Sequence, residues 1–151
     1  MKFVVAFSSP KRSAKTVEKA AQHAKAMDAE LVLLRIIPDP EKVGVVAQLI
    51  SSDRPSEKAQ QQIDEVVAKL KEQGVNASGL VRVGQVAKSI VKIANDELKA
   101  DLIFVGTASV GKSFFMMERD PIVNYLVANC PVSLFLVRQD TSAKLSDEGD
   151  G

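Results

Sequence analysis

The sequence is poor in the residues that build disulfide frameworks, metal centres and catalytic triads. Its 151 residues include one cysteine, Cys130, and one histidine, His23. A single cysteine excludes an internal disulfide and is typical of a reducing compartment, so we expect a cytoplasmic protein. No Cys-x-x-Cys motif, no set of serine, histidine and acid, and no pair of carboxylates at strand ends is present. We therefore expect no catalytic residues, no metal site and no enzymatic activity, and a structural role for His23.

Charge of one sign and long apolar runs are also missing. Lys and Arg total 20 and Asp and Glu total 19, which leaves a net charge of +1 and argues against an electrostatic grip on nucleic acid or anionic lipid. No apolar run reaches the roughly 18 residues of a membrane helix. The run 3–7 is too short for the core of a signal peptide. We expect neither nucleic acid nor a membrane as a partner.

Five short apolar runs alternate with segments in which apolar residues recur at helical spacing. Three of the runs are apolar nearly throughout, as in parallel strands that are buried on both faces. The order βαβαβαβαβ predicts an open, mostly parallel, Rossmann-like α/β sheet with helices on both faces. The five predicted strands span residues 3–7, 31–37, 79–83, 101–105 and 132–137.

Capping residues indicate where two of the helices begin and end. Ser56 follows Pro55 and precedes a helical pattern that would run for about 17 residues to Gly74, a residue typical of helix ends. Asp120 before Pro121 predicts that the last helix starts there, because Asp is a good N-cap and Pro suits the first helical position. That helix is predicted to run to about Asn129.

Two segments do not fit the alternating pattern. The connection 38–55 is long and holds one short apolar stretch, which we interpret as a mobile excursion from the fold. The tail 139–151 has almost no apolar residues and four acids, a composition typical of disorder. We therefore predict one domain over residues 1–138, followed by a disordered acidic tail.

The segment after the fourth strand matches the phosphate-binding P-loop pattern G-x-x-x-x-G-K-[ST] over Gly106–Ser113. Three features argue against an NTPase. Pro121 interrupts the helix that should follow, no later strand ends in a metal-binding acid, and the motif follows the fourth strand rather than the first. A P-loop NTPase that uses Gly106–Ser113 stays the remote alternative.

The segment 81–107, which ends in ADLIFVGT, resembles the third strand, third helix and fourth strand of the universal stress protein family. The sequence NCPV at 129–132 is similar to the entry into that family's fifth strand, and the apolar first strand with its Ser-rich turn fits too. The resemblance extends over about residues 2–138. It implies the strand order 3-2-1-4-5 and a homodimer that pairs through the strand at 132–137.

Family members that bind ATP carry G-x2-G-x9-G-[ST] after strand four and an Asp after strand one. Gly106 matches the first glycine, whereas Ser109 stands at the second and Gly111 follows two residues later. The final Gly-Ser falls on Arg119-Asp120, and the Asp falls on Ser8. Since one position of the four is kept, the resemblance implies weak or atypical binding at most.

The physical effect of these changes can be estimated. Ser8 is a weaker acceptor than a carboxylate, and a lost charge-assisted hydrogen bond lowers affinity by roughly 10- to 100-fold. Asp120 would cap the last helix and occupy N–H groups that otherwise bind phosphate. A shifted anion site that uses Gly106, Gly111 and Lys112 stays open. The candidate ligand-binding residues are Ser8, Ile36, Gly106, Ser109, Gly111, Lys112, Arg119 and Asp120.

We therefore expect a cytoplasmic, homodimeric module related to universal stress proteins. Its ligand would be an adenine nucleotide, ATP or AMP, or another anion, held weakly where the loops after strands one and four meet. No cofactor is required. The alternative is an interaction module of the same fold that has lost nucleotide binding and acts through its dimer or a partner.

Overall fold

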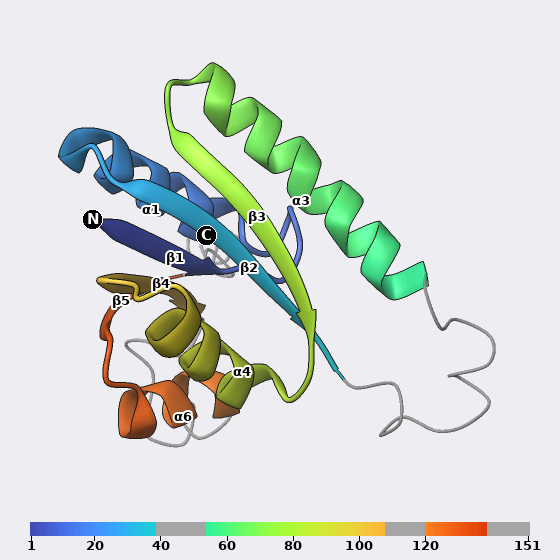
Figure 1. Ribbon diagram of the computed structural model, residues 1–151, viewed down its shortest axis with the longest axis vertical. Helices are drawn as coiled ribbons and strands as arrows, with labels where there is room; N and C mark the ends of the chain where they lie inside the picture. Colours follow the sequence, from blue (N-terminus) through green and yellow to red (C-terminus); the bar gives the residue numbers. More distant parts are fainter. Residues whose placement is uncertain (39–53, 108–119, 139–151) are drawn as a thin grey trace, which may run out of the picture.

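The computed structural model describes residues 1–38, 54–107 and 120–138. Its five strands form one parallel sheet in the order β3-β2-β1-β4-β5, as predicted (Figure 1). The predicted excursion lies outside the described residues over 39–53, and the predicted tail 139–151 lies outside them entirely. The strands are β1 (Lys2–Ala6), β2 (Glu30–Ile37), β3 (Asn76–Val83), β4 (Leu102–Thr107) and β5 (Ser133–Arg138).

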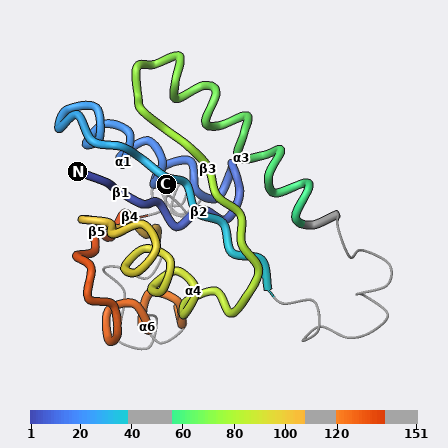
Figure 2. The backbone as a smooth tube through the Cα atoms, viewed as in Figure 1, coloured from blue at the N-terminus to red at the C-terminus, as the bar shows by residue number. Residues whose placement is uncertain are grey.

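Helices cover both faces of the sheet. Those on one face are α1 (Ala14–Met27) and α3 (Arg54–Glu72). Those on the other are α4 (Val86–Lys92), which continues into the π-helical turn η2 (Ile93–Glu97), and α6 (Pro121–Asn129). Figures 1 and 2 show α4 and α6 side by side under β4 and β5, while α3 runs along β3. Because both faces carry helices, strands β1, β2 and β4 are buried on both sides, which explains their continuous apolar runs.

An aromatic cluster forms part of the core under α1. The ring centroid of Phe104 lies 5.7 Å from that of Phe3 and 4.8 Å from that of Phe135. The ring of His23 meets Phe135 edge-on at 4.9 Å, and its Nδ1 lies 2.9 Å from the carbonyl oxygen of Lys19. His23 therefore has the packing role that the sequence predicts, and it fastens α1 to β4 and β5.

Local signals located some boundaries well and missed others. Gly74 follows α3 with a left-handed φ of +88°, as its place at a helix end requires. The prediction of Ser56 as N-cap is wrong, because α3 already begins at Arg54 and the proline falls within the first turn, where a missing N–H is tolerated. Strand β3 begins at Asn76, three residues before the apolar run, because backbone pairing with β2 extends through its polar start.

No helix in the described part of the chain is long and apolar enough to cross a membrane. Groups of three or more metal-ligating side chains are likewise absent from the described residues.

Candidate functional site

A cavity of about 320 Å³ opens at the carboxyl ends of β1, β2 and β4. Parallel pairing of β1 with both neighbours brings the segments that follow these strands to one edge of the sheet. Four of the predicted residues line this cavity, namely Ser8, Ile36, Gly106 and Asp120. The turn after strand one and the end of strand four thus share one crevice, which confirms the geometric basis of the predicted site.

The other four predicted residues, Ser109, Gly111, Lys112 and Arg119, lie outside the described residues. The same holds for the P-loop pattern beyond Thr107.

Ser8 is part of a local hydroxyl network. Its backbone N–H donates to the Oγ of Ser13 at 2.8 Å, and the two hydroxyl oxygens lie 3.2 Å apart. Ser13 is buried and its own N–H donates to the carbonyl oxygen of Ser9 at 2.9 Å, so the turn before α1 is tightly closed. At the position where the family resemblance implies a carboxylate, the cavity has a neutral hydroxyl pair.

Asp120 caps α6, as its position before Pro121 predicts. Its Oδ1 accepts a hydrogen bond of 3.2 Å from the N–H of Val123, and its Oδ2 accepts one of 3.0 Å from the hydroxyl of Thr107. Thr107 is buried at the end of β4. The carboxylate therefore satisfies a free N–H of the helix start, ties α6 to β4, and adds negative charge at the place where a phosphate would otherwise bind the helix.

Two arginines that are not among the predicted ligand-binding residues, Arg12 and Arg35, also line this cavity. Arg35 lies within β2, and its Nη1 donates to the backbone oxygen of Ser8. Its Nε is buried and has no hydrogen-bond partner. Burial lowers the pKa of the Arg35 guanidinium, and the nearby charge of Arg12 lowers it further. The one feature of the sequence that could have indicated Arg35 is its position as a single charged residue inside the apolar run 31–37.

The remaining walls of the cavity are mainly apolar. Side chains of Leu34 and Ile36 from β2 face Ile90 of α4, Val105 of β4 and Val123 of α6. Among the described lining residues the charged groups are Arg12, Arg35 and Asp120. A cavity with an apolar wall and two guanidinium groups suits a ligand that joins a flat apolar part to an anionic group.

A second cavity, of about 560 Å³, lies between α1 and α3 on the other face of the sheet. Its polar residues, which include Glu18, Gln22 and Lys69, come from the exposed sides of the two helices. It does not bring strand ends together. Among the described residues, Lys25 Nζ there donates a hydrogen bond to the backbone oxygen of Gln73 at 2.8 Å. This cavity is larger than the one at the strand ends. The cavity at the strand ends is nevertheless the stronger candidate for a binding site, because it combines an apolar wall with two arginines.

Comparison with known proteins gives a consistent result. The sequence matches the model of the universal stress protein family over residues 1–138. No match was found among curated proteins. Among solved structures, a universal stress protein in complex with cAMP has a TM-score of 0.69 at 19% identity and covers 91% of this chain and 96% of its own.

Two further structures have the same fold. A universal stress protein from Archaeoglobus fulgidus in complex with dAMP gives a TM-score of 0.66 at 13% identity, over 92% of this chain and 96% of that one. An Arabidopsis thaliana member with AMP bound gives 0.67 at 14% identity, over 100% and 99%. At these identities the structures establish the fold, and the family match covers nearly all of the chain outside the tail. The chain belongs to the universal stress protein family.

Proposed function

We propose that this protein is a non-enzymatic binding module that takes an adenine nucleotide or a related anion, weakly, in the cavity between β1 and β4. The observation that carries the proposal is the cavity itself, in which Arg35, half-buried and with a buried Nε, stands beside an apolar wall. Structures of the same fold hold cAMP, dAMP and AMP, which supports an adenine nucleotide as the ligand.

Two features of the cavity explain why binding is weak. Ser8 offers a hydroxyl that already interacts with Ser13, so a ribose hydroxyl would find a neutral and partly occupied partner. The carboxylate of Asp120 occupies the N–H of Val123, so a phosphate at α6 would meet a negative charge and fewer donors.

Thermal-shift and calorimetric titrations with AMP, ADP and ATP, with and without Mg²⁺, test the proposal. Nucleotide at ten times its dissociation constant should add about 1.4 kcal/mol to the free energy of unfolding and raise Tm by about 3–5 °C. Absence of any shift at about 10 mM nucleotide would reject nucleotide binding and favour the interaction module.

We expect no phosphate release from ATP; release that Lys112→Ala abolishes would establish the P-loop NTPase instead.

We also propose that two copies pair through β5. This strand is at one edge of the sheet, and an unpaired edge with exposed apolar side chains is usually covered in native proteins. Leu136 is 37% exposed on it, and the neighbouring Phe135 is half-buried.

Leu136→Lys should halve the mass measured by light scattering, because a charge on the paired edge opposes association. The matched control is Val83→Lys on the opposite edge strand β3, where Val83 is 49% exposed and the mass should not change. A monomeric wild type, or an effect of Val83→Lys alone, would contradict pairing through β5.

A further inference from the structure

Arg35 has an unusual position for an arginine. It interrupts the buried run of β2, between Leu34 at 1% exposure and Ile36 at 5%, and its Cα pairs with Val81 of β3. Its backbone is therefore held by pairing with β3, one residue beyond the last β1–β2 pair at Leu34, which gives the side chain a rigid base. The hydrogen bond from Nη1 to the backbone oxygen of Ser8 then orients the planar guanidinium against the turn that leads into α1.

This orientation leaves one donor without an acceptor. The Nε of Arg35 is buried and makes no hydrogen bond, although buried donors are paired in the great majority of cases. A buried N–H of a charged group destabilises the protein when it is unpaired, and this cost is removed when a ligand provides an acceptor. The unpaired Nε therefore points to an acceptor that the described residues of the protein do not supply.

The charges around the cavity favour an anionic acceptor. Arg12, on the turn between β1 and α1, lies near enough to lower the pKa of Arg35, and both side chains line the cavity. The only acid among the described lining residues is Asp120, whose carboxylate is bonded to Thr107 and the start of α6. Because β1 separates β2 from β4 in the sheet, this carboxylate belongs to the far side of the cavity from Arg35.

We propose that Arg35, together with Arg12, forms an anion-binding pair that holds a phosphate group on the β1–β2 side of the cavity. The inference rests on the proposed function, since it assigns the ligand class of the same cavity. The phosphate group can belong to a nucleotide or to a free polyphosphate, and both present the oxygen geometry that a guanidinium binds with two parallel hydrogen bonds. In this arrangement the ligand's charge is bound away from Asp120, at the end of the cavity where the chain has positive groups.

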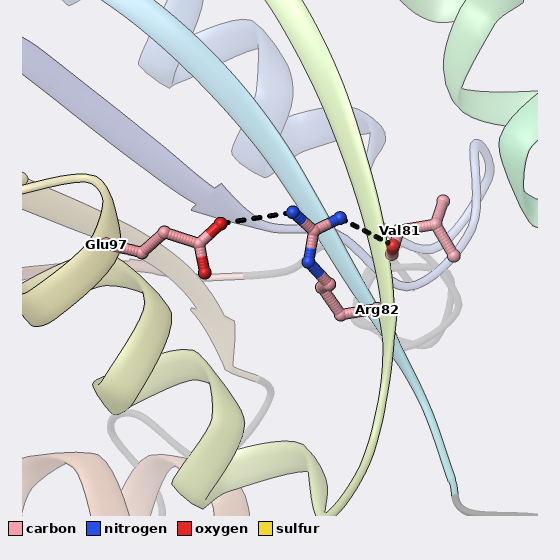
Figure 3. Close-up of polar contacts among 3 residues, drawn as sticks. All are labelled: Val81, Arg82 and Glu97. Carbon is pink, nitrogen blue, oxygen red and sulfur yellow. Dashed lines mark hydrogen bonds and ion pairs between the residues drawn. The ribbon is translucent and has the colours of Figure 1, made fainter.

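Arg82 provides a matched control. It lies on the neighbouring strand β3, and its Nη2 is 3.0 Å from a carboxylate oxygen of Glu97, with the two side chains 43% and 49% exposed (Figure 3). Its Nη1 donates to the backbone oxygen of Val81 at 3.2 Å, and it is not among the residues that line the cavity. Removing this arginine changes the net charge as much as removing Arg35 does, without changing the cavity.

The test compares Arg35→Met, Arg35→Lys and Arg82→Met with the wild type by calorimetric titration with AMP, adenosine and pyrophosphate. We expect the wild type to bind AMP more tightly than adenosine, and Arg35→Met to weaken AMP and pyrophosphate by roughly 10- to 100-fold while adenosine is unchanged. Arg35→Lys should keep part of the affinity, because it keeps the charge and loses the planar fork. Arg82→Met should bind all three ligands like the wild type.

Unchanged adenosine binding also shows that a variant is folded, and Arg35→Lys serves if Arg35→Met does not fold. Equal binding of AMP and adenosine by the wild type, or equal weakening of both in the Arg35 variants, would overturn the anion pair and leave the proposed function intact. Pyrophosphate binding that depends on Arg35 without any adenine nucleotide binding would establish the pair and reject the nucleotide. Absence of binding to all three ligands would reject both proposals.

Discussion

Replacing Gly79 with alanine should destabilise the protein by about 2–3 kcal/mol, which lowers Tm by about 5–10 °C for a domain of this size. Gly79 lies in β3 directly beneath α3. A Cβ added there would lie 1.9 Å from the Cγ2 of Ile63, a residue of α3 that is 0% exposed. Since Ile63 is packed in the core, it cannot turn away freely, and α3 must move off the sheet to admit one methyl group. Chemical or thermal unfolding measures the loss.

Three further variants connect this loss of stability to the contact between Gly79 and Ile63. Ser78→Ala is the control, because Ser78 is the adjacent and exposed residue of the same strand, and it should change the stability by less than about 0.5 kcal/mol. Ile63→Ala alone should cost about 2–5 kcal/mol by leaving a cavity. The double variant should be more stable than the sum of the single changes predicts by about 1 kcal/mol or more, since the new methyl group fills that space. Strict additivity, or a Gly79→Ala protein as stable as the wild type, would contradict the close approach of α3.

Asp120→Ala should have opposite effects on stability and on anion binding. It removes the cap of α6 and the acceptor for Thr107, so we expect the free energy of unfolding to fall by about 1–2 kcal/mol. It also frees the N–H of Val123 and removes the negative charge from the cavity. We expect AMP affinity to rise by up to roughly tenfold, the effect of removing a like charge from the opposite side of the same partly buried cavity.

Asp120→Asn separates the two contributions. Asparagine caps helices about as well as aspartate, so stability should stay near that of the wild type while the charge is lost. AMP affinity should then rise through the charge alone, and by less than in Asp120→Ala. If Asp120→Asn binds AMP like the wild type and Asp120→Ala binds it more weakly, Asp120 is part of the ligand site and does not repel the phosphate.

The predictions from the sequence succeeded where one segment of chain carries the whole signal. The start of α6 follows from Asp120 and Pro121 alone, because a cap and the first helical residue are adjacent in the chain. The meeting of Ser8 with Gly106 in one cavity follows from the strand order, which the family resemblance implies, and from parallel pairing, which the alternating pattern predicts. The start of β3 could not be predicted from apolar residues, because its first residues are mainly polar. Backbone pairing with β2 determines where this strand begins.

The residues of the site that depend on packing could not be predicted in this way. Arg35 bonds the backbone of Ser8, 27 positions earlier, and the approach of Arg12 to Arg35 depends on how the turn before α1 folds over the end of β2. In the sequence Arg35 is one charge in an apolar run, and nothing near it marks its Nε as buried and unpaired. That state depends on which atoms from other strands surround the guanidinium.

The sequence by itself therefore determined the layered α/β fold, the strand order through its family resemblance, and the capping aspartate at α6. Hydrophobic periodicity and helix capping involve residues that are close together in the chain, so both can be recognised in the sequence alone. Only the tertiary structure decided that the cavity has two arginines on its β1–β2 side and a bonded carboxylate on its β4 side. Electrostatic and hydrogen-bonding partners are set by distance in space, and the chain brings these groups together only when the sheet forms.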